Sequence, residues 1–125
     1  MNGDVIKLEL PAKPDYILAV RLAVSAVAER AGFDIEDIED LKVAAAEACM
    51  LLLSSCPENV SIKITVDGGM HIDLSAQGAN GAAAADDDTA ELSRCLLEAL
   101  VDKCEFSGGS DSKASVSRVS FFKKL

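Results

Sequence analysis

The sequence predicts an α+β fold of two layers, in which helices cover one face of a mostly antiparallel sheet. Apolar residues alternate in several short segments, as in half-buried strands, and recur every three or four residues in three longer segments, as in helices. These segments follow one another as strand, helix, helix, hairpin, loop, helix and hairpin. The length of 125 residues suits a single domain, residues 1–125.

Composition limits the partners that we expect. Half of the residues are hydrophobic but only 4% are aromatic, which predicts a core of Ala, Val, Leu and Ile. Acidic residues outnumber basic ones by 21 to 12, and the resulting net charge of −9 would repel nucleic acid. The sequence shows neither a signal peptide nor an apolar run long enough to span a membrane. We therefore expect a cytoplasmic protein with neither nucleic acid nor membrane as a partner.

The N-terminal half predicts one strand and two helices. Residues 5–10 alternate between apolar and polar types, as a half-buried strand does. Pro14 suits the first turn of a helix whose apolar stripe ends before Gly32, a residue that favours a left-handed C-cap. Asp34 is the expected N-cap of the next helix. The run 44–53 within that helix is apolar nearly all round, so it should be deeply buried.

The middle of the chain predicts a β-hairpin. Residues 60–67 and 70–74 both alternate, and the glycines at 68–69 suit a tight turn between them. The apolar residues of both strands should face the core. His71 falls on the polar face, where we expect a solvated side chain and neither a metal ligand nor a catalytic base.

The last third predicts a loop, a helix and a closing hairpin. Residues 77–90 are mostly small or acidic, and the three carboxylates at 86–88 lack the spacing of an EF-hand calcium loop. Asp88 or Thr89 would cap the following helix, and two strands around a turn at 108–111 would close the chain. The core stripe of that helix should consist of Leu92, Leu96, Ala99 and Leu100.

The four cysteines are spaced too unevenly for the paired clusters of a zinc site. We expect them to be reduced and buried, as small apolar residues, and we expect no metal. They are Cys49, Cys56, Cys95 and Cys104.

Four segments resemble the bacterial anti-sigma-factor serine protein kinases of the histidine-kinase-like (GHKL) ATPase superfamily. They are Leu10–Arg21, Ala31–Phe33, Ile38–Ala44 and Glu47–Cys49. The resemblance begins near residue 6, is specific in the first half of the chain and is weaker in the second. It implies the two-layer fold of that superfamily. Members of the family bind ATP, phosphorylate a serine of an antagonist protein and sequester a sigma factor.

The resemblance also implies that two nucleotide-binding motifs are altered. The first pairs a Glu with an Asn four residues later that coordinates magnesium; here Glu47 remains, but Leu51 stands at the Asn position. The second is Asp-x-Gly-x-Gly, whose Asp accepts from the adenine amino group; here Ala76, Gly78 and Asn80 occupy the segment. Leucine offers no oxygen to magnesium, and alanine offers no acceptor to a purine.

The third motif of the family is a glycine pair at the start of the helix after the ATP lid, where free backbone amides meet phosphate. The segment Glu91-Leu92-Ser93-Arg94 occupies its position, behind the acidic run 86–88. Negative charge therefore stands where phosphate would bind. We interpret the chain as a degenerate member of the family without a cofactor.

These losses predict a non-catalytic, anti-sigma-factor-like regulator that binds protein in a partner-switching system. Arg21 stands where the family contacts both a sigma factor and an antagonist protein, and Asp15 and Tyr16 lie beside it. The alternative is a serine protein kinase that holds ATP and magnesium in a rearranged site, with Glu47 as general base and residues 86–88 recruited to the metal. A third hypothesis is a homodimeric interaction module without any link to sigma factors.

Overall fold

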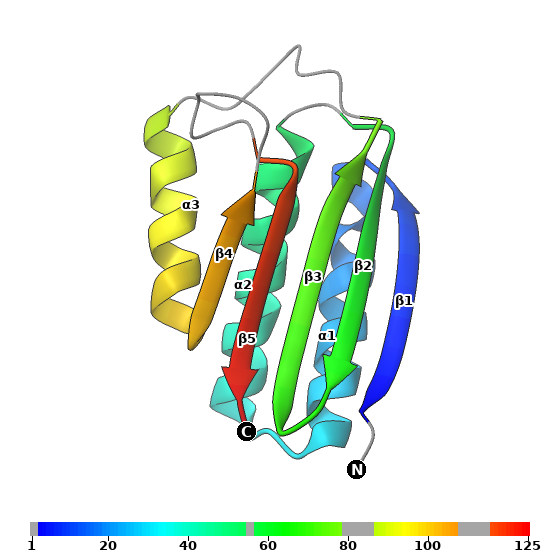
Figure 1. The fold of residues 1–125 in the computed structure, drawn as a ribbon, viewed down its shortest axis with the longest axis vertical. Helices are drawn as coiled ribbons and strands as arrows, with labels where there is room; N and C mark the ends of the chain where they lie inside the picture. The colour runs from blue at the N-terminus through cyan, green and yellow to red at the C-terminus, as the bar shows by residue number, and fades with distance from the viewer. Residues whose placement is uncertain (1–2, 55–56, 79–86, 108–115) are drawn as a thin grey trace.

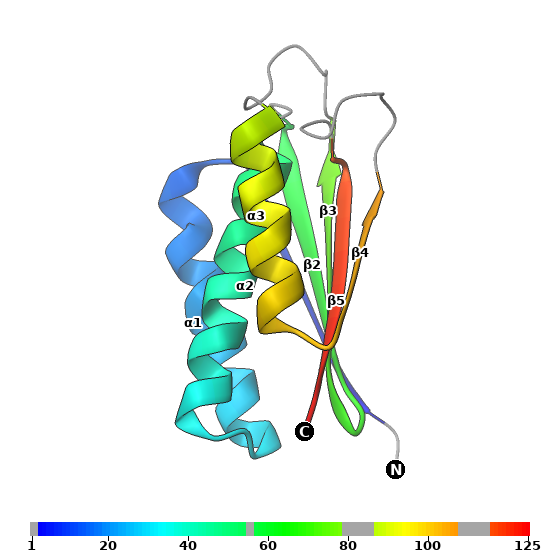
Figure 2. The ribbon, with the colours of Figure 1, turned by 90° about the vertical axis from the view of Figure 1, so that its left-hand side faces the viewer.

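A computed structural model of the chain describes residues 3–54, 57–78, 87–107 and 116–125, and these form two layers (Figures 1 and 2). In chain order the elements are β1 (Asp4–Pro11), the 3-10 turn η1 (Pro14–Tyr16), α1 (Ile17–Ala31), α2 (Ile35–Leu53), β2 (Asn59–Val66), β3 (Gly69–Gln77), α3 (Asp87–Leu100), β4 (Lys103–Ser107) and β5 (Arg118–Lys124). The described strands form a sheet in the order β1-β2-β3-β5-β4, and all neighbours are antiparallel. The predicted fold class is therefore confirmed.

The ends of α1 and α2 follow the predicted capping residues. Gly32 adopts a left-handed conformation with φ of 103°, and its N–H donates to the carbonyl groups of Ala28 and Glu29. The carboxylate of Asp34 accepts from the backbone N–H of Asp37 at 2.8 Å. Pro14 begins a short 3-10 turn, so the α-helix itself starts three residues later than expected; such turns are common at the starts of α-helices.

Helix α2 lies between α1 and α3 and covers the centre of the sheet (Figure 2). Its alanines at 44, 45 and 48 are completely buried, and their small size lets the helix lie close to the sheet. The predicted deep burial of the second half of α2 is confirmed except at Met50, which is 53% exposed. The largest fully buried side chains of the core include Leu41, Leu52, Ile62, Ile64, Met70, Ile72, Leu74, Leu97 and Phe121.

The predicted core stripe of α3 is wrong. Leu92 is 62% exposed, Leu96 is 38% exposed, Ala99 is exposed and Leu100 is half-buried. The buried residues of the segment are instead Ala90, Ser93, Leu97 and Val101. The prediction placed Leu92 and Leu96 on the apolar face of the helix. Ser93 lies at the centre of the face that is buried, so the apolar spacing of that face is hard to recognise in the sequence.

The loop predicted at 77–90, the turn predicted at 108–111 and Cys56 lie partly or wholly outside the described residues. Helix α3 begins at Asp87, so Asp88 and Thr89 lie in its first turn and the predicted loop ends earlier than residue 90. Positions 79–86 of that loop, the turn at 108–111 and Cys56 lie outside the described residues.

The cysteine prediction is partly wrong. Cys49 is buried and Cys104 is half-buried, but Cys95 is exposed on α3. Burial raises the pKa of Cys49 to about 12 and that of Cys104 to about 11, so both thiols stay protonated at neutral pH. Within the described ranges there is no group of three or more His, Cys, Asp or Glu side chains that could hold a metal ion. The helices in those ranges are also too short or too polar to cross a membrane.

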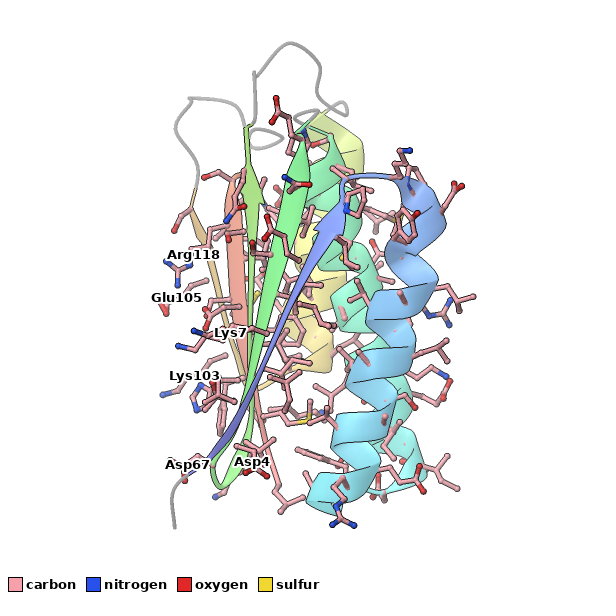
Figure 3. All side chains as sticks on the ribbon, turned by 90° about the vertical axis from the view of Figure 1, so that its right-hand side faces the viewer. Asp4, Lys7, Asp67, Lys103, Glu105 and Arg118 are labelled. Carbon is pink, nitrogen blue, oxygen red and sulfur yellow. The ribbon has the colours of Figure 1, made fainter. Side chains whose placement is uncertain are left out.

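The open face of the sheet is polar. Lys7, Lys103, Glu105 and Arg118 project from it on the side away from the helices (Figure 3). His71 is exposed there, as predicted, and its ring lies 4.3 Å from that of Phe122, centroid to centroid. The prediction that the alternating apolar residues of the hairpin strands face the core is therefore confirmed.

Lys123 joins the two layers at the end of β5. Its side chain is 13% exposed, and its ammonium group donates to the carbonyl oxygen of Leu100 at 2.9 Å. The carboxylates of Asp37 and Asp40 lie 3.6 and 3.8 Å from the same nitrogen. One side chain thus connects β5 to the C-terminal end of α3 and to the N-terminal part of α2.

We predict that Lys123→Met lowers the free energy of unfolding by about 1–2 kcal/mol, because a hydrogen bond to a charged group and two ion pairs are lost. Urea denaturation measures the change. Lys124→Met is the matched control, since the side chain of Lys124 is exposed and its backbone N–H, which donates to Asp102, is retained. Equal effects of the two substitutions would contradict this role for Lys123.

Candidate functional site: the α2–α3 contact and the start of α1

Helix α2 places Glu47 and Leu51 one turn apart on the side that faces α3. Leu51 is 3% exposed and belongs to the apolar core. Glu47 is half-buried, and its Oε1 accepts a hydrogen bond of 2.9 Å from the hydroxyl of Ser93 on α3. Ser93 is 7% exposed, so this hydrogen bond lies inside the contact between the helices.

The segment Glu91–Arg94 lies inside α3, because the helix starts four residues earlier, at Asp87. Only the first four N–H groups of a helix are free of intrahelical bonds, so the amides of this segment are engaged within the helix. Arg94 turns towards β4, where its guanidinium carbon lies 4.6 Å from the centre of the Phe106 ring. The side chains at this position therefore hold α3 against its neighbours.

The end of β3 carries the second group of predicted site residues. Ala76 is half-buried and packs against the same core cluster that contains Leu51. Gly78 has φ of 73°, a left-handed conformation that favours glycine, and a Cβ atom there would come within 2.9 Å of the side chain of Glu58. Asn80 lies outside the described residues.

The start of α1 carries the predicted partner-binding residues. Asp15 and Tyr16 are exposed in η1, and Arg21 is half-buried on α1. Its Nε atom is buried and has no hydrogen-bond partner among the residues that the structure describes. Leu18 and Leu22 lie close to it along the helix and are 60% and 59% exposed.

The sequence matches the model of one protein family over residues 10–117, which covers most of the chain. That family is the histidine kinase-like ATPase domain. The chain belongs to this family.

Several similar proteins are bacterial serine-protein kinases. The serine-protein kinase RsbW of Bacillus subtilis is 48% identical over 48 residues, which are 38% of this chain and 30% of that protein. RsbW of Oceanobacillus iheyensis is 42% identical over 73 residues, which are 58% of this chain and 46% of the relative. RsbW of Listeria monocytogenes serotype 4b is 58% identical over 45 residues, 36% and 29% of the two chains. The chain thus matches less than half the length of each relative.

A solved structure supports the same fold. The crystal structure of RsbU and RsbW domains from Mycobacterium tuberculosis has a TM-score of 0.69 to this chain and 18% sequence identity. The match covers 98% of this chain and 32% of the chain in the crystal structure. These comparisons confirm the resemblance to bacterial serine protein kinases that the sequence predicted.

Sequence reasoning missed two features of this family member. Ser93 lies in a segment that was singled out for its position, but nothing in the sequence indicated that its hydroxyl would meet Glu47. The exposed leucines at 18 and 22 were also missed, although their spacing of four residues marks one helix face.

We predict that Ser93→Ala lowers the free energy of unfolding by about 1 kcal/mol, because the half-buried carboxylate of Glu47 loses a hydrogen bond. A double-mutant cycle with Glu47→Ala should give a coupling energy of about 0.5–1.5 kcal/mol. Ser117→Ala is the control, since that hydroxyl makes a longer hydrogen bond of 3.3 Å to a carbonyl oxygen. Strictly additive effects of the Ser93 and Glu47 substitutions would mean that the bond does not form in solution.

Proposed function

We propose that the chain is a single-domain, anti-sigma-factor-like regulator that acts by binding protein in a partner-switching system and does not use ATP. The observation that carries the proposal is the contact between α2 and α3. Leu51 is buried in the core there, and Glu47 already accepts a hydrogen bond from Ser93.

A magnesium ion would find poor ligands at this contact. Magnesium requires oxygen ligands in a nearly octahedral arrangement. In kinases and ATPases it is bound by one or two protein side chains and by the phosphates of ATP. Leu51 offers a hydrocarbon side chain that is 3% exposed, at the position where the family has its metal-binding Asn. Moving Leu51 out of the core would expose apolar surface, and an unfilled space would remain behind it.

The adenine and the phosphates would also lack partners. The side chain of Ala76 offers no acceptor to the adenine amino group, and the backbone N–H of Ala76 donates to the carbonyl oxygen of Ser117 at 2.8 Å. The amides around Ser93 lie within α3 and are not free to bind phosphate. Glu91, in the same segment, adds negative charge, which disfavours a triphosphate further.

A serine protein kinase with a rearranged nucleotide site is the second candidate function. Two observations favour it. Glu47 retains a carboxylate where a general base would act, and Gly78 retains the left-handed backbone of a glycine-rich motif. Such a kinase would require Ser93 to release Glu47 before catalysis.

We predict that ATP with magnesium leaves the melting temperature of the natural chain unchanged. A ligand at about 100 times its Kd would add about 2.7 kcal/mol of stability. For a domain of this length the melting temperature would then rise by on the order of 10 °C. Differential scanning fluorimetry measures the shift. A clear rise would favour the kinase over the regulator.

We predict that Arg21→Glu weakens binding to the sigma factor or the antagonist protein by on the order of a hundredfold, since charge reversal replaces a guanidinium–carboxylate contact with repulsion. Isothermal titration calorimetry with each purified candidate partner measures the change. Arg30→Glu is the matched control, because Arg30 is exposed at the other end of the same helix. Unchanged affinity of the Arg21→Glu variant would remove this residue from the binding surface.

A further inference from the structure

The outer face of the helical layer carries apolar side chains that nothing in the described residues covers. Leu92 and Leu96 of α3 are 62% and 38% exposed, and Val43 and Met50 of α2 are 40% and 53% exposed. The two leucines are one turn apart and the other two residues are two turns apart, so each pair lies on one helix face. We call these four residues the helix-face patch.

The two halves of the helix-face patch border the same contact. Lys123 links the end of α3 to the start of α2, and Ser93 bonds to Glu47 farther along, so α2 and α3 run antiparallel. Leu92 and Leu96 lie on the side of Ser93 opposite to Arg94, which faces β4. They are therefore turned towards α2.

Val43 and Met50 occupy the corresponding place on α2. They lie one turn before and about one turn after Glu47, which faces α3 through the Ser93 bond. The four apolar side chains thus stand above the Glu47–Ser93 hydrogen bond, two from each helix.

The surroundings of the helix-face patch are strongly acidic. Helix α2 carries five carboxylates and one lysine, and α3 carries four carboxylates and one arginine. Not all of these carboxylates border the patch, because Asp37 and Asp40 lie 3.6 and 3.8 Å from the ammonium group of Lys123 and Glu98 lies on the β4 side of α3, where its charge raises the pKa of Cys104. The carboxylates that remain exposed on the patch side are those of Glu36 and Glu39 on α2, and Lys42 is paired with Glu39 at 2.9 Å.

The opposite face of the molecule differs in charge. Lys7 and Arg118 project from the open face of the sheet (Figure 3), as do Lys103 and Glu105. Register places Lys63, Lys124, Asp73 and Glu9 on the same face, which gives five basic and three acidic side chains among the described strands. The acidic field of the chain is therefore concentrated on the helical layer, where the apolar patch lies.

We propose that the helix-face patch binds an amphipathic helix of a partner protein whose apolar stripe is flanked by lysines or arginines. An amphipathic helix presents apolar residues at spacings of three, four and seven, which matches two parallel rows of exposed apolar side chains. Its basic residues would meet the exposed carboxylates of α2, Glu36 and Glu39. The inference rests on the proposed function in one respect, that the chain acts by binding protein, and it uses residues other than Arg21.

Charge excludes two other occupants. A second copy of the chain would bring the exposed carboxylates of α2, Glu36 and Glu39, against those of its neighbour, and like charges brought together oppose association. A membrane surface is disfavoured in the same way, because anionic lipids attract basic and not acidic helix faces.

The test is a titration of the isotope-labelled full chain with two synthetic amphipathic helical peptides, followed by NMR. Both carry the same leucine stripe; one has lysines beside it and the other has glutamates. The lysine peptide should shift amide signals of α2 and α3, and its affinity should fall as salt is added. The variant Leu92→Ser/Leu96→Ser should bind it at least tenfold more weakly, which corresponds to about 1.4 kcal/mol. A cooperative melting curve of this variant checks that the fold is retained, with a somewhat lower melting temperature expected because serine is a weaker helix former than leucine.

The matched control is Val5→Ser, which removes an apolar residue that is 49% exposed on the open face of the sheet. It should leave peptide binding unchanged. The proposal is overturned if the glutamate peptide binds as tightly, if Val5→Ser weakens binding equally, or if signals of the sheet shift instead. It is also overturned if sedimentation shows a dimer that Leu92→Ser/Leu96→Ser dissociates.

The same variants separate this inference from the proposed function. Arg21→Glu should retain peptide binding at the helix-face patch. If the lysine peptide does not bind the helix-face patch while the Arg21-dependent complex still forms, this inference fails and the proposed function stands. If ATP with magnesium binds while the peptide still binds, the non-catalytic function fails and this inference stands.

Discussion

Helix α3 packs on α2 and the sheet through one buried face, and the outer surface of the helical layer depends on which side chains that face holds. Ala90, Ser93 and Leu97 point inward, and the hydroxyl of Ser93 donates to Glu47 within this contact. Leu92 and Leu96 lie beside the buried face and stay partly exposed, because one side of the helix is already packed. The packing of α3 thus accounts for the exposed apolar residues above the Glu47–Ser93 hydrogen bond.

The same contact connects the fold to the proposed loss of nucleotide chemistry. In the histidine kinase-like ATPase fold the helices above the sheet can leave room for a ligand. Here Leu51 continues the apolar core up to the Glu47–Ser93 bond, and α3 extends past the position of the family's glycine pair. A protein-binding role requires none of that room, since partners contact the outside of the helices.

The sequence predicted the parts of the structure that local physics determines. Gly32 and Asp34 end and begin their helices through backbone geometry and one short hydrogen bond, both of which depend on residue type alone. The alternation of apolar and polar residues predicted the strands, because successive side chains of a strand point to opposite faces of the sheet. The phase of α3 could not be predicted, because the pairing of Ser93 with a carboxylate 46 residues away depends on tertiary contacts. Cys95 follows from that error, since it lies on the outward face of the same helix.

A crystal structure of the chain grown with ATP and magnesium tests the central claim most directly. The account predicts that Ser93 still donates to Glu47, that Leu51 remains in the core and that no nucleotide is ordered next to α2. An adenine nucleotide bound beside α2, with its metal held near Glu47 and with α3 displaced, would contradict it.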